Sequence, residues 1–132
     1  MSPAPPSASI VLLLTRTRSL AATLTEGLAR HDDNIELHVV HTPAAFERHA
    51  ARVHPDVTII DVDGTSREEV LRLAKHPAIA GGMLVLLGDA AGDSEDPVVN
   101  AAIWIRPSAA LASDVAKIIA ANRRPDNLDQ RI

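Results

Sequence analysis

Short runs of apolar residues alternate with stretches of helical periodicity along this chain. Five runs have the length and composition of β-strands: Ile10–Leu14, 35–42, 56–64, 83–88 and 101–105. The first is continuously apolar, as in a strand covered on both faces. Between the first two runs, Leu20, Leu24 and Leu28 recur every four residues and mark one face of a helix. Strands alternating with helices predict an α/β domain, in which helices cover both faces of a doubly wound parallel sheet.

The remaining helices carry their own start signals. Thr42 followed by Pro43 predicts a helix start, with Thr42 as the N-cap. The stretch from Thr65 to Glu68 has the spacing of a capping box and predicts a second start. A last helix is predicted from the apolar stripe Leu111, Val115, Ile118 and Ile119. Between the fourth and fifth strands the helical signal is poor, so we expect the fourth helix to be short or missing.

Composition indicates one domain, with a leader before it and a tail after it. We expect a flexible, proline-rich leader over residues 1–8, a domain over 9–122 and a polar tail or linker over 123–132. A net charge of −4, with both signs interleaved, argues against a broad nucleic-acid surface. The first segment lacks the basic and apolar regions of a signal peptide, and no apolar run could span a bilayer. The expected location is therefore the cytoplasm, with no membrane contact.

The carboxyl ends of the predicted strands are where a function is expected. In open parallel sheets, ligands bind beyond these ends. The residues at these carboxyl ends are Thr15–Arg18, His41-Thr42, Asp61–Gly64, Gly88-Asp89 and Arg106-Pro107.

Three stretches carry a family resemblance: HPDVTIIDVDG (54–64), WIRPSAALASDVAKII (104–119) and TPAAFERHAARVHPDV (42–57). Together with the order of elements over 9–122, they resemble a response-regulator receiver domain, the flavodoxin-like module of two-component signalling. The resemblance implies a five-stranded sheet in the order 2-1-3-4-5. It also implies that Asp61 occupies the phospho-acceptor position, and that Arg106 stands where the family has Lys, followed by Pro107.

The chain departs from this family at most other site positions. The family's acidic pair falls on Thr15 and Arg16, and its Ser or Thr after the fourth strand is replaced by Gly88. Aspartyl phosphorylation requires Mg²⁺, which prefers carboxylate oxygens. We therefore interpret the chain as a pseudo-receiver that works without phosphorylation. Asp61 is then a structural acid, paired with Arg16 or Arg106.

Two alternatives remain open. The first is a working, Mg²⁺-dependent phospho-receiver with Asp61 as acceptor and an acidic site rebuilt from Asp63 and Asp89. The second is a flavodoxin-like domain that binds phosphate or a small molecule in the loop Thr15, Arg16, Thr17 and Ser19, beside a helix N-terminus. No pair among the six histidines has a convincing metal spacing, so no metal is expected.

The favoured interpretation is a signalling module, not an enzyme, that needs no cofactor and acts through protein partners. Val98, Val99 and Trp104 are candidates for its interface, because a short fourth helix would leave them thinly covered. A homodimer is one form that such a contact can take. The partner and the pathway are not encoded in these residues.

Overall fold

The computed structural model describes residues 9–31, 34–63, 65–88, 102–106, 108 and 110–123. The strands are β1 (Ser9–Leu14), β2 (Ile35–Val40), β3 (Val57–Asp61), β4 (Met83–Leu87) and β5 (Ile103–Ile105). The α-helices are α1 (Arg18–His31), α2 (Pro43–Val53), α3 (Arg67–Ala74) and α5 (Leu111–Arg123), with a 3₁₀ turn at Pro77–Ile79. The expected leader, the segment 89–101, Pro107 and residues 124–132 lie outside the described residues.

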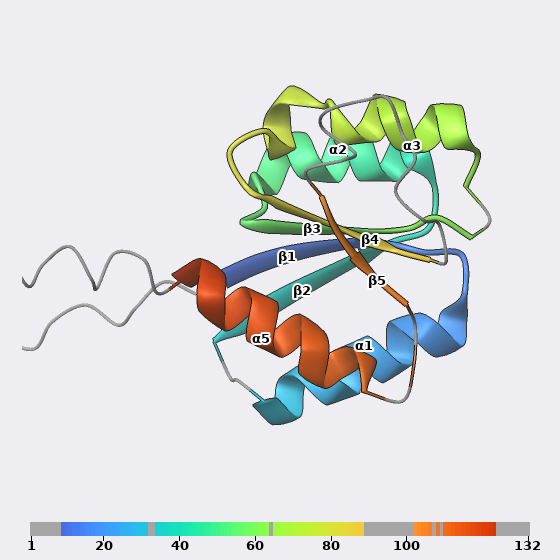
Figure 1. The fold of residues 1–132 in the computed structure, drawn as a ribbon. Helices are drawn as coiled ribbons and strands as arrows, with labels where there is room; N and C mark the ends of the chain where they lie inside the picture. Colours follow the sequence, from blue (N-terminus) through green and yellow to red (C-terminus); the bar gives the residue numbers. More distant parts are fainter. Residues whose placement is uncertain are drawn as a thin grey trace, which may run out of the picture.

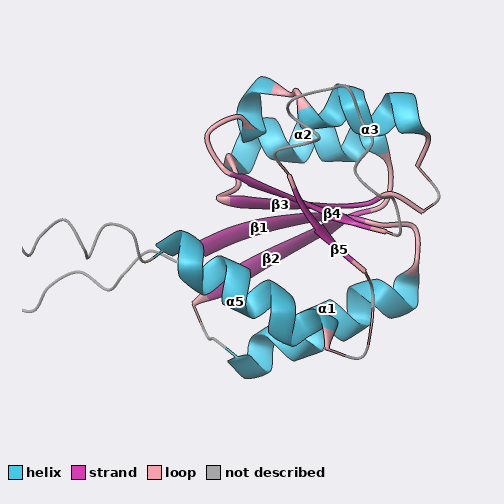
Figure 2. Cartoon of the chain, in the orientation of Figure 1, coloured by secondary structure: helices cyan, strands magenta, loops and turns pink. Residues whose placement is uncertain are grey.

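The strands form one parallel sheet in the order β2-β1-β3-β4-β5, which confirms the predicted topology. Helices α2 and α3 cover one face, and α1 and α5 cover the other (Figure 1; Figure 2). Strands β2, β3 and β5 are shorter than predicted, since β2 ends at Val40, β3 ends at Asp61 and β5 begins at Ile103. The residues that follow Val40 and Asp61 lie beyond the strands, at this edge of the sheet.

Each face of the sheet has its own apolar cluster. Side chains alternate along a strand, so neighbouring residues of β3 separate: Ile60 packs with the α2–α3 cluster and Ile59 with the α1–α5 cluster. Both residues are fully buried. The continuous apolar runs of the sequence therefore reflect strands that are covered on both sides.

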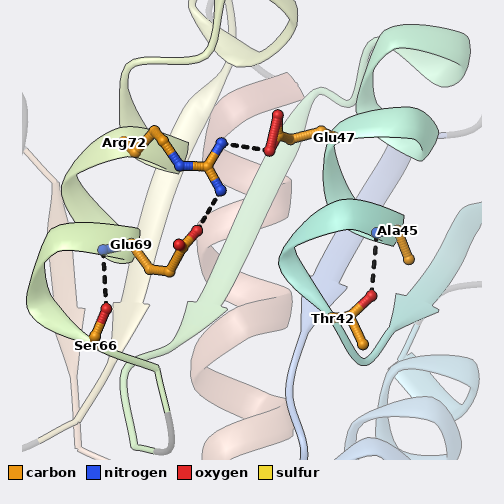
Figure 3. A network of polar contacts seen from close by, with 6 residues as sticks. All are labelled: Thr42, Ala45, Glu47, Ser66, Glu69 and Arg72. Carbon is orange, nitrogen blue, oxygen red and sulfur yellow. Dashed lines mark hydrogen bonds and ion pairs between the residues drawn. The ribbon is translucent and has the colours of Figure 1, made fainter.

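Two helices begin at hydroxyl caps. The Thr42 hydroxyl accepts a hydrogen bond from the Ala45 N–H (3.1 Å), as predicted, and α2 follows with Pro43 in its first turn. The cap of α3 is Ser66, whose hydroxyl accepts from the Glu69 N–H (3.2 Å) (Figure 3). The predicted cap, Thr65, was wrong by one residue. Its hydroxyl instead donates to the Asp61 carbonyl oxygen (3.1 Å), which holds the loop after β3 against the strand.

Helices α2 and α3 are joined at their exposed surface. The Arg72 guanidinium of α3 binds the carboxylates of Glu47 on α2 and Glu69 on its own helix (Figure 3). Ion pairs this exposed to solvent contribute little to stability. The network links the two helices at the surface.

The α1–α5 contact is close. A Cβ built on Gly27 of α1 would lie 2.2 Å from the Cβ of Ala112 on α5. Glycine in a helix interior costs about 1 kcal/mol relative to alanine, so its place here follows from the approach of the two backbones. Within the described residues, no helix combines the length and apolar character needed to cross a membrane.

Candidate functional site

The site lies where the three central strands end together. The register pairs Leu14 of β1 with Ile60 of β3, and Asp61 of β3 with Leu87 of β4. The next residues along β1 and β4 are Thr15 and Gly88, so both lie beside Asp61 at one edge of the sheet. The sequence placed these three positions correctly relative to the strand ends.

The Asp61 carboxylate is enclosed and fully engaged. Asp61 is 3% exposed and Thr15 is 1% exposed. The Thr15 hydroxyl donates to Asp61 Oδ2 (2.7 Å), and the Asp63 N–H donates to Oδ1 (3.1 Å). Each carboxylate oxygen therefore has a donor from the protein itself. A buried carboxylate needs such partners because losing its water is costly.

Thr15 is fixed in turn by its own loop. Its hydroxyl accepts from the Thr17 N–H (3.0 Å), and its N–H donates to the Val40 carbonyl oxygen (3.1 Å). The Thr15 carbonyl oxygen is 2.8 Å from Nδ1 of His41, at the end of β2. Polar contacts thus run from the buried Asp61 through Thr15 to the exposed His41.

The expected ion pair of Asp61 with Arg16 or Arg106 is wrong. Among the ion pairs of the described residues, none includes Asp61, and both arginines are exposed. Thr15, the first residue beyond β1, points inward, and Arg16 follows on the solvent side. A short hydroxyl reaches the buried carboxylate without the loss of hydration that a guanidinium would suffer.

Gly88 has no room for a side chain. A Cβ at this position would lie 2.2 Å from Cγ2 of Val62. Val62 is held in place by its N–H, which donates to the Leu87 carbonyl oxygen (3.0 Å), and Gly88 donates its own N–H to Ile105 (3.0 Å). The valine side chain therefore takes the space into which a Ser or Thr at 88 would extend. Our sequence reasoning missed Val62, although a lone β-branched residue between Asp61 and Asp63 was the available signal.

The acidic alternative gains little support from the described residues. Strand β3 ends at Asp61, so Asp63 lies in the following turn and is exposed. Asp89 and Pro107 are outside the described residues. Among the described side chains, no three His, Cys, Asp or Glu residues converge as metal ligands. Hard oxygen ligands of the kind that Mg²⁺ prefers are therefore not gathered into a three-ligand group around Asp61 in the described part of the chain.

The structure agrees only in part with the hypothesis that the loop before α1 binds an anion. The Thr15 hydroxyl is committed to Asp61 and to Thr17, so it is not free for a ligand. Arg16, Thr17 and Ser19 are exposed, and α1 begins at Arg18, which places Ser19 within its first turn. An open groove of about 530 Å³ lies beside this loop, between α1 and β2, and its lining includes Arg18, Val39 and His41.

Trp104 lies on β5 and packs, half-buried, against the α2–α3 cluster. Its indole N–H is buried and has no hydrogen-bond partner in the described part of the chain. The other two interface candidates, Val98 and Val99, lie outside that part. The proposed interface therefore stays a prediction.

The sequence reasoning also missed a second polar constellation. His38 of β2 and His49 of α2 are 2.8 Å apart at Nδ1 and Nε2, and His38 Nε2 is 2.6 Å from the Glu36 carboxylate. The pKa of His49 lies below its usual 6.5, because of partial burial and the nearby positive charges of His38 and Arg52. Eleven positions of sequence separate the two rings, so no local spacing pattern could have paired them.

Comparison with known proteins identifies the fold. No family model and no curated protein matches the chain. Among solved structures, a response-regulator-receiver-modulated diguanylate cyclase from Pelobacter carbinolicus matches with a TM-score of 0.69 and 17% identity, covering 94% of this chain and 99% of that one. An orphan response regulator of H. pylori matches with a TM-score of 0.66 and 18% identity, and the match covers 90% of this chain and 100% of that one. A response regulator receiver domain protein from Bacillus halodurans matches with a TM-score of 0.65 and 18% identity, and the match covers 89% of this chain and 98% of that one.

At these identities the similarity establishes the architecture and not the activity. The strand order and the helices on both faces of the sheet (Figure 1) agree with it. The chain has the fold of response-regulator receiver domains.

Proposed function

We propose that this chain is a receiver-like regulatory module that signals through protein contacts and does not depend on phosphorylation of Asp61. The observation that carries the proposal is the 2.7 Å hydrogen bond from the Thr15 hydroxyl to the Asp61 carboxylate, in a site where Asp61 is 3% exposed. A phospho-acceptor must instead present an oxygen to an incoming phosphoryl group and to Mg²⁺.

Two further features support the same conclusion. Thr15 and Arg16 stand where the resemblance places an acidic pair, so neither residue offers Mg²⁺ the carboxylate oxygen that it prefers. Val62 fills the space beside Gly88, where the resemblance expects the hydroxyl that contacts a phosphoryl group. Asp61 and Thr15 are buried, and each carboxylate oxygen of Asp61 accepts a hydrogen bond from the chain itself.

The test is a titration with Mg²⁺ and then with Mg²⁺ plus beryllofluoride, which imitates an aspartyl phosphate. Trp104 is the single tryptophan and its fluorescence is the readout. It pairs with Leu86 on β4, one position from Leu87, which pairs with Asp61. We expect no saturable change in the fluorescence. The urea unfolding transition, followed by the same signal, shows that Trp104 reports on the fold.

A rebuilt variant serves as the positive control. Thr15→Asp replaces the inward-pointing hydroxyl by a carboxylate beside Asp61, and we expect it to gain a saturable response to Mg²⁺. A saturable response of the unmodified chain that disappears in Asp61→Asn would contradict the proposal and favour a working phospho-receiver.

A further inference from the structure

Three polar side chains form a continuous chain from the edge strand to the helix that covers it. Glu36 and His38 lie two residues apart on β2 and therefore share one face. Val40, the next residue on that face, is buried in the α2–α3 cluster with Phe46. His49 of α2 lies against His38, with ring centroids 4.7 Å apart and planes tilted by 55°.

This cluster lacks the features of a metal site. Both nitrogens of His38 are engaged, Nε2 with Glu36 and Nδ1 with His49. Within the described residues, no three His, Cys, Asp or Glu side chains are arranged to hold one metal ion. The Arg52 guanidinium acts on His49 from the same helix, and its charge opposes a bound cation. Protons, not metal ions, are the species that this arrangement can exchange.

The hydrogen bonds fix where protons lie in the neutral pair. An ionised carboxylate only accepts, so His38 must donate to Glu36 from Nε2. A neutral imidazole has one N–H, which leaves Nδ1 of His38 as an acceptor. His49 then donates its Nε2–H to that nitrogen.

A first added proton leaves the chain of contacts intact. It is best held on His38, where the Glu36 carboxylate at 2.6 Å compensates the charge. His38 then donates from both nitrogens, and His49 accepts at Nε2 after moving its own proton to Nδ1. A second proton cannot be accommodated in this way, because both facing nitrogens would be donors and both rings would be cations.

We propose that the His38–His49 pair is an acid-sensitive latch that holds α2 against the edge strand β2 until the second proton is bound. The charged groups that face the pair are Glu36 from β2 and Arg52 from α2. Glu36 can balance one imidazolium, whereas Arg52 adds to the repulsion at His49. The latch lies on β2 and α2, so it can respond to pH without any change at Asp61.

The lowered pKa of His49 agrees with this order of protonation, because the positive charge of His38 is one of the causes of the lowering. The sign follows from linkage. A His whose pKa is lower in the folded than in the unfolded chain, where it is near 6.5, binds more protons when unfolded. Its contribution to stability is therefore complete above about pH 6.5 and is lost as the pH falls from there through the folded pKa.

Loss of the His38–His49 contact changes how α2 is held at the surface of the domain. The inner residues of α2, Phe46 and Ala50, stay buried in the core, while Glu47 binds Arg72 of α3. Opening of the latch therefore weakens the contact of α2 with the edge strand, and the attachment to α3 persists. The surface that changes is the outer part of the α2–β2 layer.

The experiment compares the unmodified chain with His49→Gln across pH 8 to pH 5. Glutamine keeps an N–H donor for His38 Nδ1 and does not titrate. We expect the urea midpoint of the unmodified chain to fall further on acidification than that of His49→Gln. His31→Gln, at the exposed end of α1, is the matched control and should follow the unmodified chain.

NMR titration of the histidine rings gives a second readout that does not depend on stability. We expect the pKa of His49 to lie below 6.5 and His38→Gln to raise it, because the charge of His38 is one cause of the lowering. Parallel pH profiles for the unmodified chain and His49→Gln, or independent titration of both rings near pH 6.5, would overturn the proposal.

Discussion

At the scale of single residues, the site is decided by one hydroxyl. The resemblance to receiver domains implied that Asp61 ends the third strand, and β3 does end there, but the partner of Asp61 was predicted wrongly. The sequence offered two arginines as counter-charges, and the structure uses Thr15. The choice depends on which residue after β1 points inward, and a loop has no periodicity from which that direction could be predicted.

Removing this hydroxyl tests its role. Thr15→Val keeps the shape of the side chain and leaves one buried oxygen of Asp61 without its donor. We expect a loss of about 1–3 kcal/mol in the free energy of unfolding, measured by urea denaturation.

Thr25→Val is the control for that substitution. The Thr25 side chain is exposed, and its hydroxyl bonds to the Ala21 carbonyl oxygen of the same helix. We expect a change within about 0.5 kcal/mol. In an Asp61→Asn background the cost of Thr15→Val should shrink, because an unpaired amide is less costly than an unpaired carboxylate. Equal costs for the two threonine substitutions would contradict the assigned role.

At the scale of elements, the two helices on one face pack at a glycine. The sequence showed the apolar stripe of α1 through Leu24 and Leu28, and both are buried. It did not show that Gly27, beside that stripe, allows α5 to approach. Helical propensity alone would count this glycine as a weakness of α1.

Helix propensity alone predicts that replacing Gly27 by alanine would stabilise α1. The packing predicts the opposite change in stability. Gly27→Ala should destabilise the chain by about 1–3 kcal/mol, because the new Cβ would overlap Ala112 in a well-packed contact. Adding Ala112→Gly to this variant should recover part of the loss, since it removes the overlapping atom. Thermal or urea unfolding of the two variants measures both effects. A single variant more stable than the unmodified chain would contradict the close contact.

At the scale of the whole molecule, the sheet couples the apolar clusters on its two faces. Adjacent residues Ile59 and Ile60 serve opposite clusters through a single strand. Neither cluster can be lost without exposing the shared strands, so we expect one cooperative transition.

Matched substitutions on the two faces test this coupling. Ile59→Val and Ile60→Val should each cost about 0.5–1.5 kcal/mol. Trp104 belongs to the cluster of Ile60. Its fluorescence and the far-ultraviolet circular dichroism should nevertheless give the same urea midpoint in both variants. If Ile59→Val moved the dichroism transition but not that of Trp104, the two faces would be independent.

The sequence by itself determined the order of elements, the burial of both faces of the sheet, the Thr42 cap and the position of Asp61. The first three properties follow from local periodicity and from hydrogen bonding between neighbouring residues, whereas the position of Asp61 was implied by the resemblance to receiver domains. The tertiary structure decided the rest: Thr15 as the partner of Asp61, Val62 in the space beside Gly88, and His38 against His49. Such contacts join separate elements and depend on strand register and on packing at the scale of an ångström, which residue spacing does not specify.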